Sequence, residues 1–157
     1  ASKGERFPFA DPEARSFWVG EPEDAADRFR AVLEGVAFVE RLCFVHLESL
    51  GASLSGPVSS TGGGAKSRLW SQLRADVLRI PVVVPRSSEG SVGMAILARA
   101  GDGSVAEAAS RMSQKEWEFE PADADGRLAE NFGRLMAAFV ERGYIPEDLA
   151  ERARMER

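Results

Sequence analysis

The chain has 157 residues, of which 44% are hydrophobic and 29% charged, and its formal net charge is −5 at pH 7. This size and composition predict one globular domain, residues 1–157, with enough apolar side chains for a core. Basic residues are scattered among acidic ones, which argues against nucleic acid or an anionic membrane surface as the main partner. No run of residues approaches the roughly 18 apolar positions needed to span a bilayer.

The chain contains one cysteine, Cys43, which lies in an apolar stretch. An internal disulfide is therefore impossible, and we interpret the side chain as a buried, inert thiol. The first six residues, Ala1–Arg6, are polar and do not form the apolar core of a secretory signal. Together these features favour a reducing cytoplasm as the location.

The N-terminal third predicts an irregular segment followed by a long helix. Residues 4–20 combine Pro, Asp, Glu and Arg with aromatic rings, which we expect to be buried and to hold the segment to the surface: Phe7, Phe9, Phe17 and Trp18. The helix is predicted from Glu21 to Leu50, with Pro22 in its first turn and Gly51 as its stop. Its buried face is expected to carry a stripe of Phe29, Val32, Leu33, Val36, Val39, Cys43, Leu47 and Leu50, widened by Phe38, Phe44 and Val45.

The middle of the chain alternates predicted strands and helices. Residues 57–60 predict a short strand, and apolar positions between Leu69 and Leu78 predict a helix. Residues 80–85 predict a strand at a sheet edge, because Pro81 cannot donate to a ladder. Residues 90–100 are small and apolar on nearly all sides, which is typical of a helix buried against a sheet.

The last third predicts two helices and a strand. Ser104–Glu107 is a capping box that starts a short helix, and residues 116–120 alternate charges with rings as in a half-exposed strand. A last long helix carries Leu128, Phe132, Leu135, Met136 and Phe139, and a charged tail begins at Glu147. This alternation predicts an α/β layered domain with few strands and much helix.

The most informative stretch is residues 59–67, Ser-Ser-Thr-Gly-Gly-Gly-Ala-Lys-Ser, because three glycines stand between a predicted strand and a predicted helix. Glycine amides can approach a ligand closely, and the first turn of the helix offers unpaired N–H groups. The stretch therefore predicts a phosphate-binding turn. A glycine triplet alone is more often only a flexible turn.

Three blocks of the chain together resemble one protein family. Residues 4–15 contain GERFP followed by DP and AR, residues 30–38 read RAVLEGVAF, and the third block begins GGGAKS at residue 62. The third block continues with Trp70, Gln72, the Ala75–Val77 triplet and Pro81–Val82 at matching spacing. In these blocks the chain resembles the C-terminal domain of the FGGY family of carbohydrate kinases, which includes xylulokinase, gluconokinase, ribulokinase and glycerol kinase.

The resemblance implies a ribonuclease H-like, actin-like ATPase fold and the C-terminal half of a two-domain sugar kinase. It implies ATP or ADP and Mg²⁺ as ligands, with backbone from Gly62, Gly63 and Gly64 near the nucleotide and Ser67 facing adenine or ribose. Lys66 either adds a charge near the phosphates or points to solvent. The sugar site and the catalytic base are expected in an N-terminal domain, which no region here resembles. We therefore expect no catalytic residue and no metal ligand set in this chain, and no activity from it alone.

The expected reaction is transfer of the ATP γ-phosphoryl group to a sugar hydroxyl, the acceptor being a xylulose-like ketopentose, a polyol or a sugar acid. Two alternatives remain open. One is the nucleotide-binding domain of another actin-like ATPase, and the other is a non-catalytic relic of the kinase fold. A homodimer is a further possibility. Asp76 and Glu89 are interpreted as ion-pairing and helix-capping carboxylates, and His46 as structural.

Overall fold

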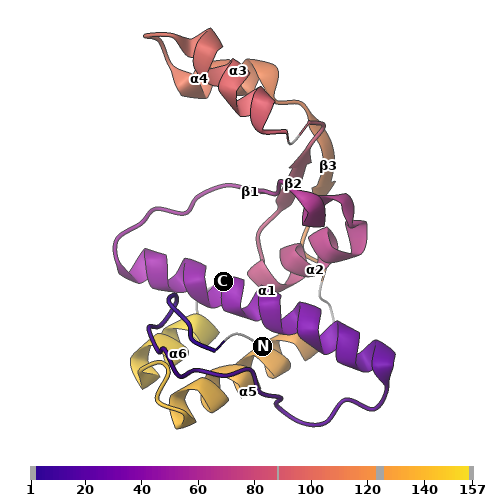
Figure 1. Cartoon of the computed structure of the whole chain (residues 1–157), viewed down its shortest axis with the longest axis vertical. Coiled ribbons are helices and arrows are strands. Elements are labelled where there is room, and N and C mark those ends of the chain that lie inside the picture. Colours follow the sequence, from indigo (N-terminus) through magenta and orange to yellow (C-terminus); the bar gives the residue numbers. More distant parts are fainter. Residues whose placement is uncertain (1–2, 88, 123–125, 156–157) are drawn as a thin grey trace. The chain divides into compact units, whose positions relative to one another are not determined.

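The computed structural model describes residues 3–87, 89–122 and 126–155. These residues form two compact units: the first contains residues up to 55, 76–79 and 122 onward, and the second contains 56–75 and 80–121. In chain order the elements of Figure 1 are α1 (Ala25–Ser49), β1 (Val58–Ser59), the 3-10 helix η1 (Gly63–Lys66), α2 (Arg68–Leu78), β2 (Val82–Pro85), α3 (Gly90–Ala100), α4 (Val105–Met112), β3 (Lys115–Phe119), α5 (Arg127–Glu141) and α6 (Glu147–Met155).

The second unit contains a three-stranded sheet in the order β1-β2-β3. β1 runs parallel to β2, with Val58 opposite Val82, and β3 runs antiparallel to it, with Phe119 opposite Val82. The prediction that this proline-bounded strand lies at an edge is therefore wrong, because β2 is central. Pro81 precedes the first paired residue and contributes only its carbonyl, which accepts a hydrogen bond from the Val58 amide at 2.9 Å.

The helix α3 begins and ends where the sequence predicts, and α4 begins where its capping box predicts. Ser104 caps α4, because its hydroxyl accepts a hydrogen bond from the Glu107 amide at 3.2 Å. The predicted burial of α3 is wrong, since none of its residues is buried and its side chains Met94 and Leu97 are 67% and 52% exposed. Within the second unit, α3 contacts α4.

In the first unit, the long predicted helix exists as α1, and of its expected buried positions Phe38 and Val45 are buried. Asp24 is its N-cap and accepts from the Asp27 amide at 2.8 Å, so Pro22 precedes the helix. The residues that α1 buries are Glu34, Ala37, Phe38, Arg41, Leu42 and Val45. The predicted stripe is largely exposed, as in Phe29, Val32, Val36, Leu47 and Leu50.

The C-terminal helices complete the first unit. α5 buries Leu128, Phe132, Met136 and Phe139, as the sequence predicts, whereas Leu135 is half-buried. The predicted charged tail is wrong, because the residues from Glu147 form α6 and three of them are buried: Leu149, Ala150 and Ala153. These three positions share one helix face, and the charged residues between them occupy the other.

The N-terminal segment contains no helix in its described part and is held partly by rings. Phe9 stacks on Tyr144 with centroids 4.7 Å apart, and Phe17 meets Phe139 edge-on at 5.9 Å. The predicted burial is wrong for Phe7 and Trp18, which are 40% and 49% exposed.

Arg79, which follows α2, has a φ of 56°, in the left-handed region that favours glycine. We expect Arg79→Gly to be more stable than Arg79→Ala, with a measured difference in the free energy of unfolding of about 0.5–1 kcal/mol in urea denaturation. This difference is what remains after the larger conformational entropy of glycine in the unfolded chain has offset part of the gain. Comparison with alanine cancels the loss of the arginine side chain's own contacts. Equal stability of the two variants would contradict this reading of the turn.

Candidate functional site

The three glycines form the turn that the sequence predicts between β1 and α2. Gly62 caps η1 with its carbonyl, which accepts from the Ala65 amide at 3.2 Å, and Gly64 accepts from the Ser67 amide at 3.0 Å. All three glycines are exposed. A 3-10 turn therefore separates the strand from α2, and its glycine backbone faces solvent.

The three glycines differ in what the fold requires of them. Gly62 has a φ of +84°, which a side chain would strain. A β-carbon on Gly64 would lie 3.2 Å from the indole nitrogen of Trp70, which is tighter than ordinary packing. Gly63 has ordinary φ, and a β-carbon there would meet nothing within 4 Å. The described structure thus explains two of the glycines and leaves open space at the third.

Ser67 and Lys66 lie at the junction with α2. The Ser67 hydroxyl accepts a hydrogen bond from the Trp70 amide at 3.3 Å, and its carbonyl accepts from the Ser71 amide at 3.0 Å, so Ser67 caps α2. A hydroxyl that accepts one bond still has its own proton to donate to a ligand. Lys66 is exposed and makes no ion pair within the described residues.

The segment between β1 and the glycines is anchored from α2. The Ser60 amide donates to the Val83 carbonyl at 2.8 Å, and its hydroxyl, on a residue that is 4% exposed, accepts from Arg74 at 2.6 Å. The Arg74 guanidinium also lies 6.0 Å from the centre of the Trp70 ring. Arg74 is therefore half-buried and fixes the start of the glycine turn.

A cavity of about 290 Å³ opens where β1 and β2 end. Its lining includes Ser59 and Pro85, the last residues of β1 and β2, Thr61 after β1, Glu89 and Gly93 at the start of α3, and Lys115 of β3. In α/β proteins, ligands bind at the carboxyl ends of parallel strands, which is the place of this cavity. The cavity reaches the glycine turn at Thr61, whereas Gly62–Gly64, Lys66 and Ser67 do not line it.

Sequence reasoning missed Thr61 and Lys115 as lining residues. Thr61 could have been found from its place at the end of a strand, but Lys115 comes from a strand more than fifty residues later. Lys115 already has a partner, because its amine lies 2.7 Å from a Glu118 carboxylate oxygen. Glu89 occupies the N-cap position of α3, as expected, but its side chain makes no capping hydrogen bond there.

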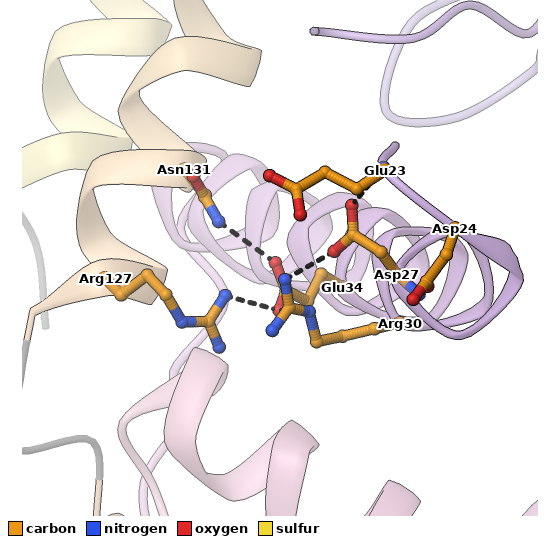
Figure 2. Close-up of polar contacts among 7 residues, drawn as sticks. All are labelled: Glu23, Asp24, Asp27, Arg30, Glu34, Arg127 and Asn131. Carbon is orange, nitrogen blue, oxygen red and sulfur yellow. Dashed lines mark hydrogen bonds and ion pairs between the residues drawn. The ribbon is translucent and has the colours of Figure 1, made fainter. Parts of the chain in front are cut away.

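A second polar cluster lies in the first unit, around the carboxylate of Glu34 (Figure 2). One carboxylate oxygen accepts from Arg127 of α5 at 2.7 Å and lies 3.7 Å from the Arg30 guanidinium, and the other accepts from Asn131 at 3.1 Å. The Glu34 side chain is 7% exposed, so these donors satisfy a charge that would otherwise be costly to bury. Because the carboxylate is engaged by three side chains, we assign Glu34 a structural role in joining α1 to α5.

Cys43 and His46 also lie on α1. The His46 ring lies 5.5 Å from the ring of Phe7, which agrees with a structural role. Burial, and secondarily the charges of Glu5 and Glu40, raise the pKa of the Cys43 thiol from 9.0 to about 11. The thiol is therefore protonated at neutral pH; the side chain is half-buried rather than fully buried as expected, and its inertness stays a prediction.

We expect iodoacetamide to alkylate Cys43 at pH 8 about 100-fold more slowly in the folded chain than in the urea-unfolded chain, because a two-unit rise in pKa lowers the thiolate fraction by that factor. The raised pKa also contributes to the free energy of unfolding. This contribution is fully present below pH 9 and is lost as the pH increases from 9 toward 11. Mass spectrometry after timed quenching measures the rate. Similar rates in the two states would show that the thiol is not shielded.

No cluster of three or more His, Cys, Asp or Glu side chains is arranged to hold a metal ion in residues 3–87, 89–122 and 126–155. None of the helices in this part of the chain has the length and apolar character that a bilayer crossing requires.

Comparison with known proteins shows what the chain resembles. Residues 1–101 match the model of the FGGY family of carbohydrate kinases, C-terminal domain. A xylulose kinase from Staphylococcus epidermidis is 32% identical over 144 residues, which cover 88% of this chain and 29% of the relative. The chain thus spans about 29% of the length of such curated relatives.

Solved structures agree with this match. A structure described as a xyloylose kinase from Brucella ovis superimposes with a TM-score of 0.75 and 28% identity, over 90% of this chain and 30% of that one. Plasmodium falciparum glycerol kinase, solved with ADP, gives a TM-score of 0.65 and 22% identity, over 87% of this chain and 28% of that one. The latter similarity supports the fold, and the predicted α/β, actin-like ATPase architecture is confirmed.

Proposed function

Because this chain belongs to the FGGY family of carbohydrate kinases as its C-terminal domain, we propose that it binds the ATP from which a sugar is phosphorylated. The observation that carries this proposal is the exposed glycine turn at the carboxyl end of β1, next to the cavity formed after β1 and β2. Parallel strand ends and glycine amides are a common setting for nucleotide phosphates.

We assign the nucleotide to the glycine turn and the adjoining cavity of the second unit. Gly63 offers open space, so its backbone can be approached by a ligand without displacing any described atom. The free Ser67 hydroxyl proton is available to adenine or ribose, and the exposed Lys66 amine is available to a phosphate. The cavity of about 290 Å³ lies at the small end of ligand sites and suits part of a nucleotide rather than all of it.

Magnesium would arrive with the nucleotide. Mg²⁺ commonly keeps several waters and is held by substrate phosphates with one or two carboxylates, so it does not need a protein cage of its own. The ADP-bound glycerol kinase is consistent with a nucleotide ligand in a protein of this fold. The bound ion would neutralise charge on the phosphates, and the chain's own amides and Lys66 would orient them.

For the whole protein we propose in-line transfer of the γ-phosphoryl group to a sugar hydroxyl, with the sugar and the catalytic base in an N-terminal domain. Under this proposal residues 1–157 supply one domain, and that domain alone is inactive. A xylulose-like ketopentose is the preferred acceptor, because two relatives named above are described as kinases of this sugar. A cytoplasmic location suits such an enzyme and its single thiol.

The test is calorimetric titration of the chain with MgADP and MgATP. We expect saturable binding at one site per chain, which would distinguish a working nucleotide domain from a relic of the fold. A chain that is folded by circular dichroism and shows no saturable binding at millimolar nucleotide would overturn the proposal. A coupled assay of the full-length protein with xylulose, gluconate and glycerol then identifies the acceptor class.

A further inference from the structure

Two side chains of α2 hold the backbone that follows β3. Gln72 donates from its side-chain amide to the Glu120 carbonyl at 2.7 Å. The Asp76 carboxylate accepts from the Ala122 amide, also at 2.7 Å. Gln72 and Asp76 are four residues apart and therefore share one face of the helix. The two hydrogen bonds hold the backbone on either side of Pro121, and we refer to this pair of bonds as the grip.

The backbone at this point needs partners from outside the sheet. The ladder between β2 and β3 ends with Phe119 opposite Val82, and Pro121 has no N–H to donate. Backbone groups that leave a ladder must be satisfied by side chains or water. The α2 side chains provide this, and they connect the exit of β3 to the helix that follows the glycine turn.

We propose that Gln72 and Asp76 are positioning residues for nucleotide binding, acting through α2 on the glycine turn; this inference rests on the function proposed above. α2 begins one residue after Ser67, the cap that closes the turn. A helix is stiff over its 11 residues, so a grip at its second and third turns sets where its first turn lies. Neither side chain is needed to touch the ligand.

Amide hydrogen exchange of the turn tests the inference without any ligand. In Asp76→Ala the carboxylate is lost, and we expect the amides of Ala65, Ser67 and Ser71 to exchange about tenfold faster than in the wild type. Asp76→Asn keeps a side-chain oxygen that can accept from the Ala122 amide, so its exchange should stay within twofold of the wild type. Gln72→Met, which keeps length but loses the donor, should behave like Asp76→Ala.

A matched control separates positioning from general loss of stability. Leu149→Ala removes a buried side chain from α6 and lowers stability without touching the grip. Exchange is compared with each variant at the same interval below its own midpoint of thermal unfolding. If Leu149→Ala accelerates exchange in the turn as much as Asp76→Ala does, or if Asp76→Ala leaves these amides unchanged, the inference is overturned.

Nucleotide titration adds a second readout. If the wild type binds MgADP, Asp76→Ala and Gln72→Met should raise the dissociation constant on the order of tenfold, with Asp76→Asn and Leu149→Ala within twofold. A wild type that does not bind contradicts the proposed function, whereas a binding wild type with unaffected Asp76→Ala contradicts the positioning role. Even in the first case, the exchange rates decide whether Gln72 and Asp76 hold the turn.

Discussion

Gly63→Asp is expected to abolish saturable binding of MgADP while the chain remains folded. A β-carbon on Gly63 meets nothing within 4 Å and its φ is ordinary, so the fold accepts the side chain. The new carboxylate would stand where we propose that phosphates approach. Two unit charges about 4 Å apart repel by about 4 kcal/mol at an effective dielectric constant near 20, which corresponds to roughly a thousandfold loss of affinity.

The measurement is calorimetric titration of the variant beside the wild type, with circular dichroism and thermal unfolding to verify the fold. Ser110→Asp is the control, because it adds the same charge at an exposed position of α4. Gly63→Ala adds bulk without charge and should weaken binding less. Retained affinity in Gly63→Asp would remove the glycine turn from the nucleotide site.

Arg41→Met is expected to lower the free energy of unfolding by about 3 kcal/mol. Arg41 is 3% exposed and donates to the carbonyls of Val77 at 3.4 Å and Ala153 at 3.2 Å. These carbonyls belong to the last turns of α2 and α6, where the helix dipoles favour a cation. The guanidinium also lies 4.3 Å from the centre of the Phe132 ring. Methionine keeps much of the bulk but leaves the carbonyls without this donor.

Urea denaturation at pH 7 measures the effect, with Arg99→Met on α3 as the control. Arg99 is exposed, so its loss should change stability by less than about 0.5 kcal/mol. Arg41→Lys, which keeps the charge but not the planar fork, should fall between the wild type and Arg41→Met. A loss below about 1 kcal/mol in Arg41→Met would mean that hydration or rearrangement compensates the two carbonyls.

The parts of the fold that sequence reasoning predicts correctly depend on neighbouring residues. The strand before the glycines, the capping serine of α4 and the apolar positions of α5 are local patterns, and the structure confirms each of them. The glycine turn was found in the same way, although its role in nucleotide binding stays a prediction. The family was recognisable because its motifs are ordered and spaced along the first 101 residues.

The errors concern partners that come from distant parts of the chain. Glu34 and Arg41 have the composition of a solvent-facing surface, yet both are buried, because α5 and α6 supply their partners from 93 and 112 residues away. The apolar stripe of α1 gave the stronger periodic signal, but it is largely exposed. Likewise, α6 was not predicted as a buried helix, because most of its residues are charged and its buried face consists of only three small or aliphatic residues. Periodicity identifies a helix more reliably than it identifies which face is covered.

The first unit is assembled from pieces that leave the ribosome at very different times. α1 is synthesised before the residues that bond to Glu34 and Arg41, which lie 93 to 112 positions further along the chain, at Arg127, Asn131 and Ala153. Closing such long loops is slow, and Glu34 and Arg41 cannot meet these partners until the later helices are made. We therefore expect this unit to complete its folding only after α6 has been synthesised. A nascent chain stopped before α5 is therefore expected to expose the apolar face of α1 and to be prone to aggregation.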